Sequence, residues 1–304
     1  MSRIRWMGGW LLVLMASGAG AADVAILKSV NNVAWRPALD ALRRNSPTHS
    51  FSEYDFQGDR AQGLRILEGL KGQKVVLVAL GPLAAQLAHQ VAPDLPLVFC
   101  MVAEPEKLGL VPSRNMTGVA LEIPVQNQLA VFRMVNPRAV RIGVLHGPDA
   151  AEAVAQAKKV AAVVRLGVYA RQLESDQDVL PALRALFSGP EPVDALWLPP
   201  DPLLLGDETR RFLLKEAAKA GKPVYAFSPS LVAEGALVSN GPDFVSIGEM
   251  AAELVRRLAE GEQEPIGMLV PRAELIINTK AATRLKIDIA AEVLAGATKS
   301  EGPR

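Results

Sequence analysis

The chain is organised around a stretch that begins Asn115-Met116-Thr117-Gly118-Val119 and continues with a helical pattern over 125–135. It ends in Arg141-Ile142-Gly143-Val144-Leu145, a short apolar strand, followed by His146-Gly147-Pro148-Asp149, which break the strand and start another helix. We interpret 117–124 as a crossover between two halves built on the same pattern of strand, loop and helix. Loops between strand ends and helix starts are where open α/β sheets bind ligands.

Length and composition set the class of the protein. The chain has 304 residues, enough for two domains, and 50% of them are hydrophobic while 21% are charged. This composition indicates a globular protein. With only 5% aromatic residues, the apolar part is mostly Ala, Leu and Val, the mixture expected of a parallel sheet covered by helices on both faces. The formal net charge of +1 and the lack of a dense basic run argue against a nucleic-acid surface.

Residues that carry catalysis or bind metals are scarce. Cys100 is the single cysteine, in an apolar run that predicts a buried thiol, and the three histidines have no metal-ligand spacing. No Gly-x-Ser-x-Gly elbow, Walker loop or zinc signature is present. We therefore expect neither an enzyme nor a bound metal or cofactor. An exported enzyme is the third hypothesis, to be tested by whether a cleft hydroxyl approaches a histidine.

The N-terminus has the pattern of a secretory signal peptide. Arg3 and Arg5 precede an apolar run over 10–16, and the small residues Ala19-Gly20-Ala21-Ala22 follow. The run is shorter than the roughly 20 apolar residues that span a bilayer. We expect residues 1–21 to be removed, with cleavage after Ala22 as the alternative, and the mature protein to be located in the periplasm.

Strands and helices are predicted to alternate, with loops of about 2–6 residues between them. The predicted strands lie at 24–28, 49–56, 74–80 and 97–102, and after the crossover at 141–145, 168–173, 195–198, 224–227 and 236–240. This alternation is typical of doubly wound parallel sheets in an α/β protein. We expect lobe I to contain 22–118 plus 243–265, lobe II to contain 119–242 plus 266–290, and 291–304 to be a flexible tail.

The ligand is expected in a cleft between the two lobes, at loops that follow strand ends. The candidate ligand-binding residues are Ser29, Asn31, Asn32, Trp35, Gly81, Pro82, Met101, Glu104, His146, Gly147, Asp149, Asp201, Ser228, Asn240 and Asp243. Each also has a structural interpretation. Trp35 could fill the core, Asp201 could be a turn residue before proline, Ser228 could start a helix, and Asp243 could mark a hinge.

Several motifs together resemble one family. They are Asn115–Val119, Pro199-Pro200-Asp201, Gly221-Lys222-Pro223-Val224, Glu234-Gly235-Ala236-Leu237 and Glu274-Leu275-Ile276-Ile277-Asn278. In this order and spacing they resemble the ABC-transporter substrate-binding proteins of the tryptophan/tyrosine-binding type, which have the type I periplasmic-binding-protein fold. The resemblance covers 24–287. It implies a Venus-flytrap protein that binds a small solute and presents it to a membrane permease, and some relatives bind aromatic amino acids.

The resemblance also implies roles for particular residues. The family's Asn-Pro-Ser type loop, which donates amides to a ligand carboxylate, corresponds to 146–150, with Gly147 in place of Asn and Asp149 in place of Ser. Asp149 could cap the following helix and would then compete with an anionic ligand. Asp201 matches the Asp of a Thr-Asp-Asn type loop, which implies a contact with a ligand amine. Glu104 stands where the family has Asp before proline.

Two functions of different classes follow. The first is a periplasmic solute-binding protein of an ABC import system, which captures a small polar solute, possibly an amino acid or aromatic compound, by hinge closure. The alternative is a periplasmic sensor subunit with the same fold that passes its state to a membrane receptor or kinase.

Overall fold

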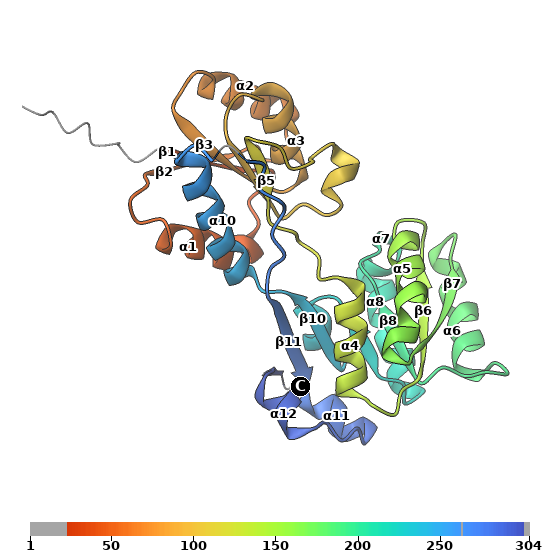
Figure 1. The fold of residues 1–304 in the computed structure, drawn as a ribbon. Helices are drawn as coiled ribbons and strands as arrows, with labels where there is room; N and C mark the ends of the chain where they lie inside the picture. Colours follow the sequence, from red (N-terminus) through yellow and green to blue (C-terminus); the bar gives the residue numbers. More distant parts are fainter. Residues whose placement is uncertain (1–22, 263, 301–304) are drawn as a thin grey trace, which may run out of the picture.

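The computed structural model describes residues 23–262 and 264–300, so the signal peptide expected over 1–21 lies outside the described residues. The chain forms two α/β lobes (Figure 1). In the part described, lobe I has a five-stranded sheet and lobe II a seven-stranded sheet. None of the helices in these ranges combines the length and the apolar character needed to cross a membrane.

Lobe I is built on a parallel sheet with the strand order β2-β1-β3-β4-β5. The strands are β1 (Asp23–Lys28), β2 (Phe51–Asp55), β3 (Val75–Leu80), β4 (Leu97–Cys100) and β5 (Met116–Gly118). Every residue of β3 is buried, as expected of a central strand covered on both faces. Helices α1 (Arg36–Arg44) and α10 (Phe244–Ala259) cover one face, and α2 (Arg60–Leu70) and α3 (Pro82–Val91) cover the other.

Lobe II is built on a mixed sheet with the order β12-β11-β10-β9-β8-β6-β7. Its strands are β6 (Arg141–His146), β7 (Gly167–Gln172), β8 (Ala195–Leu198), β9 (Val224–Ala226), β10 (Val238–Pro242), β11 (Ala273–Asn278) and β12 (Thr298–Ser300). One face packs against α4 (Val125–Val135), α5 (Ala151–Ala161), α11 (Thr279–Leu285) and α12 (Ala291–Ala295). The other packs against α6 (Val179–Ser188), α7 (Pro202–Leu205), α8 (Asp207–Lys219) and α9 (Pro229–Ala233).

Three features of the sheets differ from the sequence prediction. Strand β11 runs antiparallel to β10, because the chain enters it on its return from lobe I. Strand β5 pairs with β4, so residues 117 and 118, which the sequence analysis assigned to the crossover, lie in the first sheet; the end of lobe I at 118 agrees with the prediction. The predicted flexible tail contains α12 and β12, and it docks because Val293 is buried in the lobe II core while β12 pairs with β11.

The chain passes between the lobes at three places: 119–124, the junction between β10 and α10 at Asp243, and 260–272. The first and third connectors lie side by side. The Ala120 amide donates to the Leu269 carbonyl over 2.8 Å, and the Leu269 amide donates to the Gly118 carbonyl over 3.0 Å. The Asp243 amide donates to the Arg272 carbonyl over 2.8 Å, so the second connector is tied to the third. These hydrogen bonds hold the three connectors together as one hinge region between the lobes.

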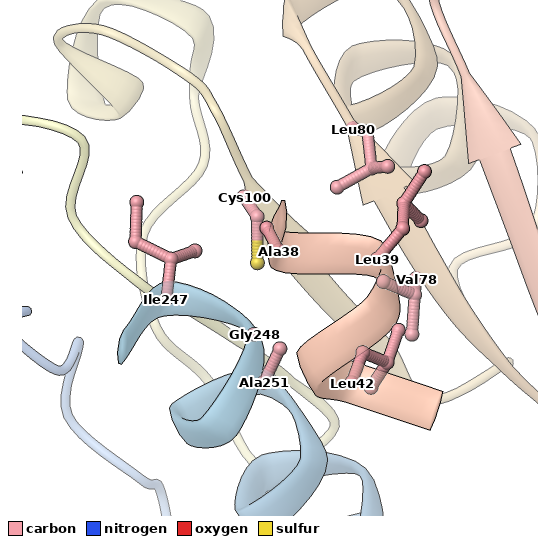
Figure 2. Close-up of a pocket in the computed structure, with 9 residues that line it drawn as sticks. All are labelled: Ala38, Leu39, Leu42, Val78, Leu80, Cys100, Ile247, Gly248 and Ala251. Atoms are coloured by element: carbon pink, nitrogen blue, oxygen red, sulfur yellow. The ribbon is translucent and has the colours of Figure 1, made fainter. Parts of the chain in front are cut away.

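Helices α1 and α10 approach each other closely because small residues face across their contact. A Cβ placed on Gly248 would lie 2.1 Å from the carbonyl oxygen of Ala38, a distance that leaves no room for any side chain. Figure 2 shows Cys100 of β4 among residues of the two helices, beside a cavity of about 10 Å³. A space of this size holds at most one water-sized sphere and has an apolar lining, so we exclude it as a ligand site.

Burial makes the Cys100 thiol unreactive in the folded protein. The side chain is 1% exposed, and burial raises its pKa to about 12, an effect that a backbone hydrogen bond with Val119 partly offsets. At pH 8 about one thiol in ten thousand is then ionised. We expect no reaction with a thiol-specific disulfide reagent in buffer and rapid reaction in urea. Reaction in buffer at the rate of a free thiol would contradict this prediction.

Candidate ligand-binding cleft

In each sheet, the strand order places a crevice between two loops. In lobe I the chain leaves β1 toward α1 on one face and leaves β3 toward α3 on the other, so the loops at 29–32 and 81–82 diverge. In lobe II the same divergence occurs between β6, which leads to α5, and β8, which leads to α7. Such switch points are where open α/β sheets hold ligands. The predicted loops at 29–32, 81–82 and 146–150 therefore lie at the carboxyl ends of strands that flank these switch points.

The lobe I crevice is organised by Ser29. Its side chain is 5% exposed, and its Oγ accepts a hydrogen bond of 2.9 Å from the Ala84 amide in the first turn of α3. The hydroxyl thus caps α3 from a different loop, a role usually taken by the residue that precedes the helix. That preceding residue is Gly81, which has no side chain with which to cap. In this structure Ser29 fixes the crevice, and its hydroxyl is occupied.

Trp35 lies against Gly81 across the same crevice. A Cβ on Gly81 would fall 2.9 Å from Cη2 of Trp35 and 2.8 Å from Oγ of Ser29, and the residue has φ of +87°. Glycine is therefore required both for its backbone conformation and for the space that the indole occupies. Trp35 remains half-buried, and Pro82, Asn31 and Asn32 beside it are exposed. Oδ1 of Asn32 accepts from the Ala34 amide at 3.0 Å, which caps the turn that carries the tryptophan.

Asp201 organises the lobe II crevice. Its carboxylate is 1% exposed and accepts three backbone hydrogen bonds: from Gly147 at 2.7 Å, from Ala150 at 3.3 Å and from Leu203 at 3.0 Å. The first two donors belong to the loop after β6 and the third to α7. The sequence analysis expected Asp201 to contact a ligand amine. The structure places it behind the loop surface, where it joins the two loops of the crevice.

The loop from His146 to Ala150 turns its polar groups inward. His146 is 6% exposed, and its Nδ1 lies 2.8 Å from the Gly147 carbonyl oxygen, so its partner is a backbone group and not a hydroxyl. A Cβ on Gly147 would lie 3.0 Å from Asp201, which accounts for glycine there. Asp149 is a candidate ligand-binding residue that could alternatively have capped α5, but Ala150 holds the cap position and no side chain caps the helix. Asp149 is exposed, and the start of α5 is uncapped.

The loop after β4 carries two residues in left-handed backbone conformations. Met101 has φ of +58° and Glu104 has φ of +46°. Met101 is 3% exposed and packs in the core beneath α10, so the structure gives it a core role in place of the predicted ligand contact. Glu104 begins the 3-10 turn Pro105–Leu108, and its Oε1 lies 2.5 Å from Nζ of Lys107. The strained turn directs this loop toward the other lobe.

A cavity of about 490 Å³ lies between the lobes, in front of the first and third connectors. It will be called the inter-lobe cavity, and its charged lining residues are Glu104, Glu106, Lys107, Glu122 and Glu152. Lobe I contributes the turn after β4, lobe II contributes the start of α5, and the connectors contribute apolar residues around Ile123 and Met268. Of the predicted site residues, only Glu104 lines this cavity. The other lining residues lie in the turn after β4, on the connectors, and on α4 and α5. For the connector residues, the predicted crossover was the signal in the sequence.

The remaining predicted residues lie where β9 and β10 end. Oγ of Ser228 is 2.8 Å from Oγ of Ser230, at the start of α9. Asn240 is 2% exposed, and its Nδ2 has no partner among the described groups. Asp243 caps α10 through a 2.9 Å bond from the Val245 amide, and Arg272 approaches it at 3.4 Å. Asp243 therefore holds the junction between the lobes, the interpretation that the sequence analysis gave beside ligand contact.

The geometry above is that of a two-lobed protein with a switch-point crevice on each lobe and a cavity between the lobes, in the type I periplasmic-binding-protein arrangement. A family model for the ABC transporter substrate binding protein matches residues 44–301, and the chain belongs to this family. This confirms the family and the fold class expected from the sequence. Members of the family are binding proteins. Within the described ranges, no group of three or more His, Cys, Asp or Glu side chains could hold a metal ion.

Individual relatives agree with this assignment. A tyrosine-binding protein of Clostridioides difficile (strain R20291) is 24% identical over 218 residues, which are 68% of this chain and 61% of that protein, so the chain spans less than two thirds of that relative. The ligand-free, open structure of a Clostridium difficile substrate binding protein with adhesive properties has a TM-score of 0.81 at 18% identity, over 93% of this chain and 100% of that one. An ABC domain of Streptococcus pneumoniae in complex with L-Trp has a TM-score of 0.66 at 21% identity, over 92% and 99%. These two likenesses concern the fold.

Proposed function

We propose that the protein is the exported solute-binding component of an ABC import system and that its solute is an aromatic amino acid. The observation that carries the proposal is that each of the two lobes has a switch-point crevice and that a cavity of about 490 Å³ lies between the lobes. A solute that contacts both rims stabilises the closed arrangement over the open one, and only this difference in contacts drives closure. A permease in the inner membrane would then recognise the closed form.

The aromatic class of solute rests on Trp35 and on two relatives. The indole of Trp35 is half-buried beside Gly81 at the lobe I crevice, so part of this aromatic side chain remains exposed to a ligand. A related protein is described as tyrosine-binding, and a structural neighbour contains L-Trp. The uncapped start of α5 offers the positive end of a helix dipole to a carboxylate, and the carboxylates of the inter-lobe cavity favour an ammonium group.

Thermal denaturation with L-tryptophan, L-tyrosine and L-alanine tests this proposal. We expect the aromatic amino acids to raise the melting temperature, because a ligand at one hundred times its Kd stabilises the folded state by about 2.7 kcal/mol. Trp35→Ala should weaken their binding at least tenfold, about 1.4 kcal/mol. Trp35→Phe should retain most of the affinity, because it keeps a stacking surface.

The matched control is Val33→Ala, which shortens an exposed side chain (70% exposed) two positions away on the same turn. It should leave affinity unchanged. Equal affinity of wild type and Trp35→Ala for an aromatic amino acid would remove Trp35 from the site. A melting temperature unaffected by both aromatic amino acids would reject the proposed class of solute.

A further inference from the structure

The inter-lobe cavity has an excess of like charge that is divided between the two lobes. Glu104 and Glu106 belong to lobe I, Glu152 belongs to α5 of lobe II, and Glu122 lies on the connector between them. The single ammonium group in the lining, on Lys107, is already paired with Glu104 at 2.5 Å. Three of the four carboxylates thus have no ion pair within the lining.

Other charged groups lie on the elements around this cluster. Asp149, before α5, also acts electrostatically on Lys107, and it adds another negative charge on the lobe II side. The third connector contributes Met268 and Val270, which carry no charge. The nearest cation along that connector is Arg272, which is paired with Glu249 at 2.8 Å and Asp243 at 3.4 Å. Among the charged groups named here, none is a second cation that is free to pair with the cluster.

Electrostatic effects cross the gap between the lobes. Partial loss of hydration in the concave wall raises the pKa of Glu122, the charges of Glu104 and Glu106 raise it further, Lys107 lowers it, and Glu152 raises it. The pKa of Lys107 is raised first by its hydrogen bond with Glu104, and Glu152 and Asp149 of lobe II add to the effect. Charges on one lobe therefore act on groups that line the other.

We propose that electrostatic repulsion within this carboxylate cluster favours open lobes at neutral pH and that protonation of the cluster permits closure on acidification. The cavity lies between the facing rims of the two sheets, so closure shortens the distance from Glu152 to Glu104 and Glu106 and increases their repulsion. The closed form consequently holds a proton more tightly than the open form. Because closure then takes up protons, the ratio of closed to open molecules rises as pH falls, by at most tenfold per pH unit for each proton taken up.

The test measures the distance between the lobes without any ligand, so it is independent of which solute is bound. Ala61→Cys in α2 and Gln177→Cys after β7 place labels on exposed positions of lobe I and lobe II. Cys100 is buried and stays unlabelled. Energy transfer between two dyes on the full chain is recorded from pH 7.5 to pH 5.5, and we expect the closed-to-open ratio of the wild type to rise at least about threefold.

The variants Glu122→Gln and Glu152→Gln remove one charge each from the connector and from lobe II. We expect both to raise the closed fraction at pH 7.5 and to flatten its dependence on pH, with unchanged melting temperature. Glu68→Gln on α2, which removes an exposed carboxylate outside the cavity, should behave as the wild type. Identical pH profiles for Glu122→Gln, Glu152→Gln and Glu68→Gln, or a closed fraction that falls on acidification, would overturn the proposal.

Discussion

Replacing Gly248 with valine is expected to lower the free energy of unfolding of lobe I by about 3 kcal/mol, the upper range of what overpacking costs. The reason is that even a Cβ at this position would lie 2.1 Å from the Ala38 carbonyl oxygen and 2.7 Å from the Ala41 side chain. The obstacle on α1 is backbone, which cannot turn aside as a flexible side chain can. Helices α1 and α10 must therefore separate, and with them part of the cover over β1, β3 and β4.

Urea unfolding monitored by circular dichroism measures this effect. The matched control is Gly69→Val in α2, where an added side chain meets no atom within 4 Å. That substitution should be neutral or slightly stabilising, because glycine is a poor residue for a helix interior. If Gly248→Val were as stable as Gly69→Val, the close contact of α1 and α10 would not exist in solution.

Replacing Asp201 with alanine is expected to cost about 3 kcal/mol of stability in lobe II. The change leaves the amides of Gly147, Ala150 and Leu203 without their acceptor in a buried place, and hydrogen bonds to charged groups contribute about 1.5–3 kcal/mol each before relaxation and water entry reduce the loss. Hydrogen exchange at Gly147 and Ala150 should accelerate together with the loss in unfolding free energy.

Asp201→Asn separates two roles for this residue. The amide oxygen keeps one acceptor while the NH₂ group faces backbone donors, so stability should fall between wild type and alanine. If instead Asp201→Ala kept full stability and lost only affinity for an amine-bearing solute, the ligand-contact role expected from the sequence would hold. A loss of stability with little change in exchange at Gly147 would contradict the structure of the loop.

The alternation of apolar runs with loops was enough to predict most elements of both sheets. Strand β3 is the clearest case, because six buried apolar residues followed by Gly81-Pro82 specify a central strand and the start of α3. The direction of β11 could not be predicted in this way, since an apolar run has the same pattern whichever way it pairs. The docking of α12 rests on Val293, which is buried in the lobe II core, and on Leu294 and Ala297, which pack against that core.

From the sequence, the loops at the switch points could be predicted but the individual contacts of their residues could not. The switch points at 29–32, 81–82, 146–150 and 199–201 follow from strand order, which the sequence indicates. Asp201 accepts a hydrogen bond from Gly147, which is 54 positions away in the sequence. The local sequence around Asp201 therefore does not tell whether its carboxylate points into the cleft or behind the loop. The lining of the inter-lobe cavity includes connector residues, whose neighbours are known only once the two lobes are placed relative to each other.

The position of α10 in lobe I has a consequence for the order in which the chain can fold. This helix follows β10 of lobe II directly, yet it covers a face of the first sheet together with α1 (Figure 1). A nascent chain that has produced all five strands of that sheet, up to Gly118, still exposes the apolar surface that Ile247, Ala251 and Val255 will cover. The N-terminal half consequently remains uncovered until residue 259 has been made, near the end of translation. Lobe I therefore cannot complete its core before the strands of lobe II up to β10 have also been made.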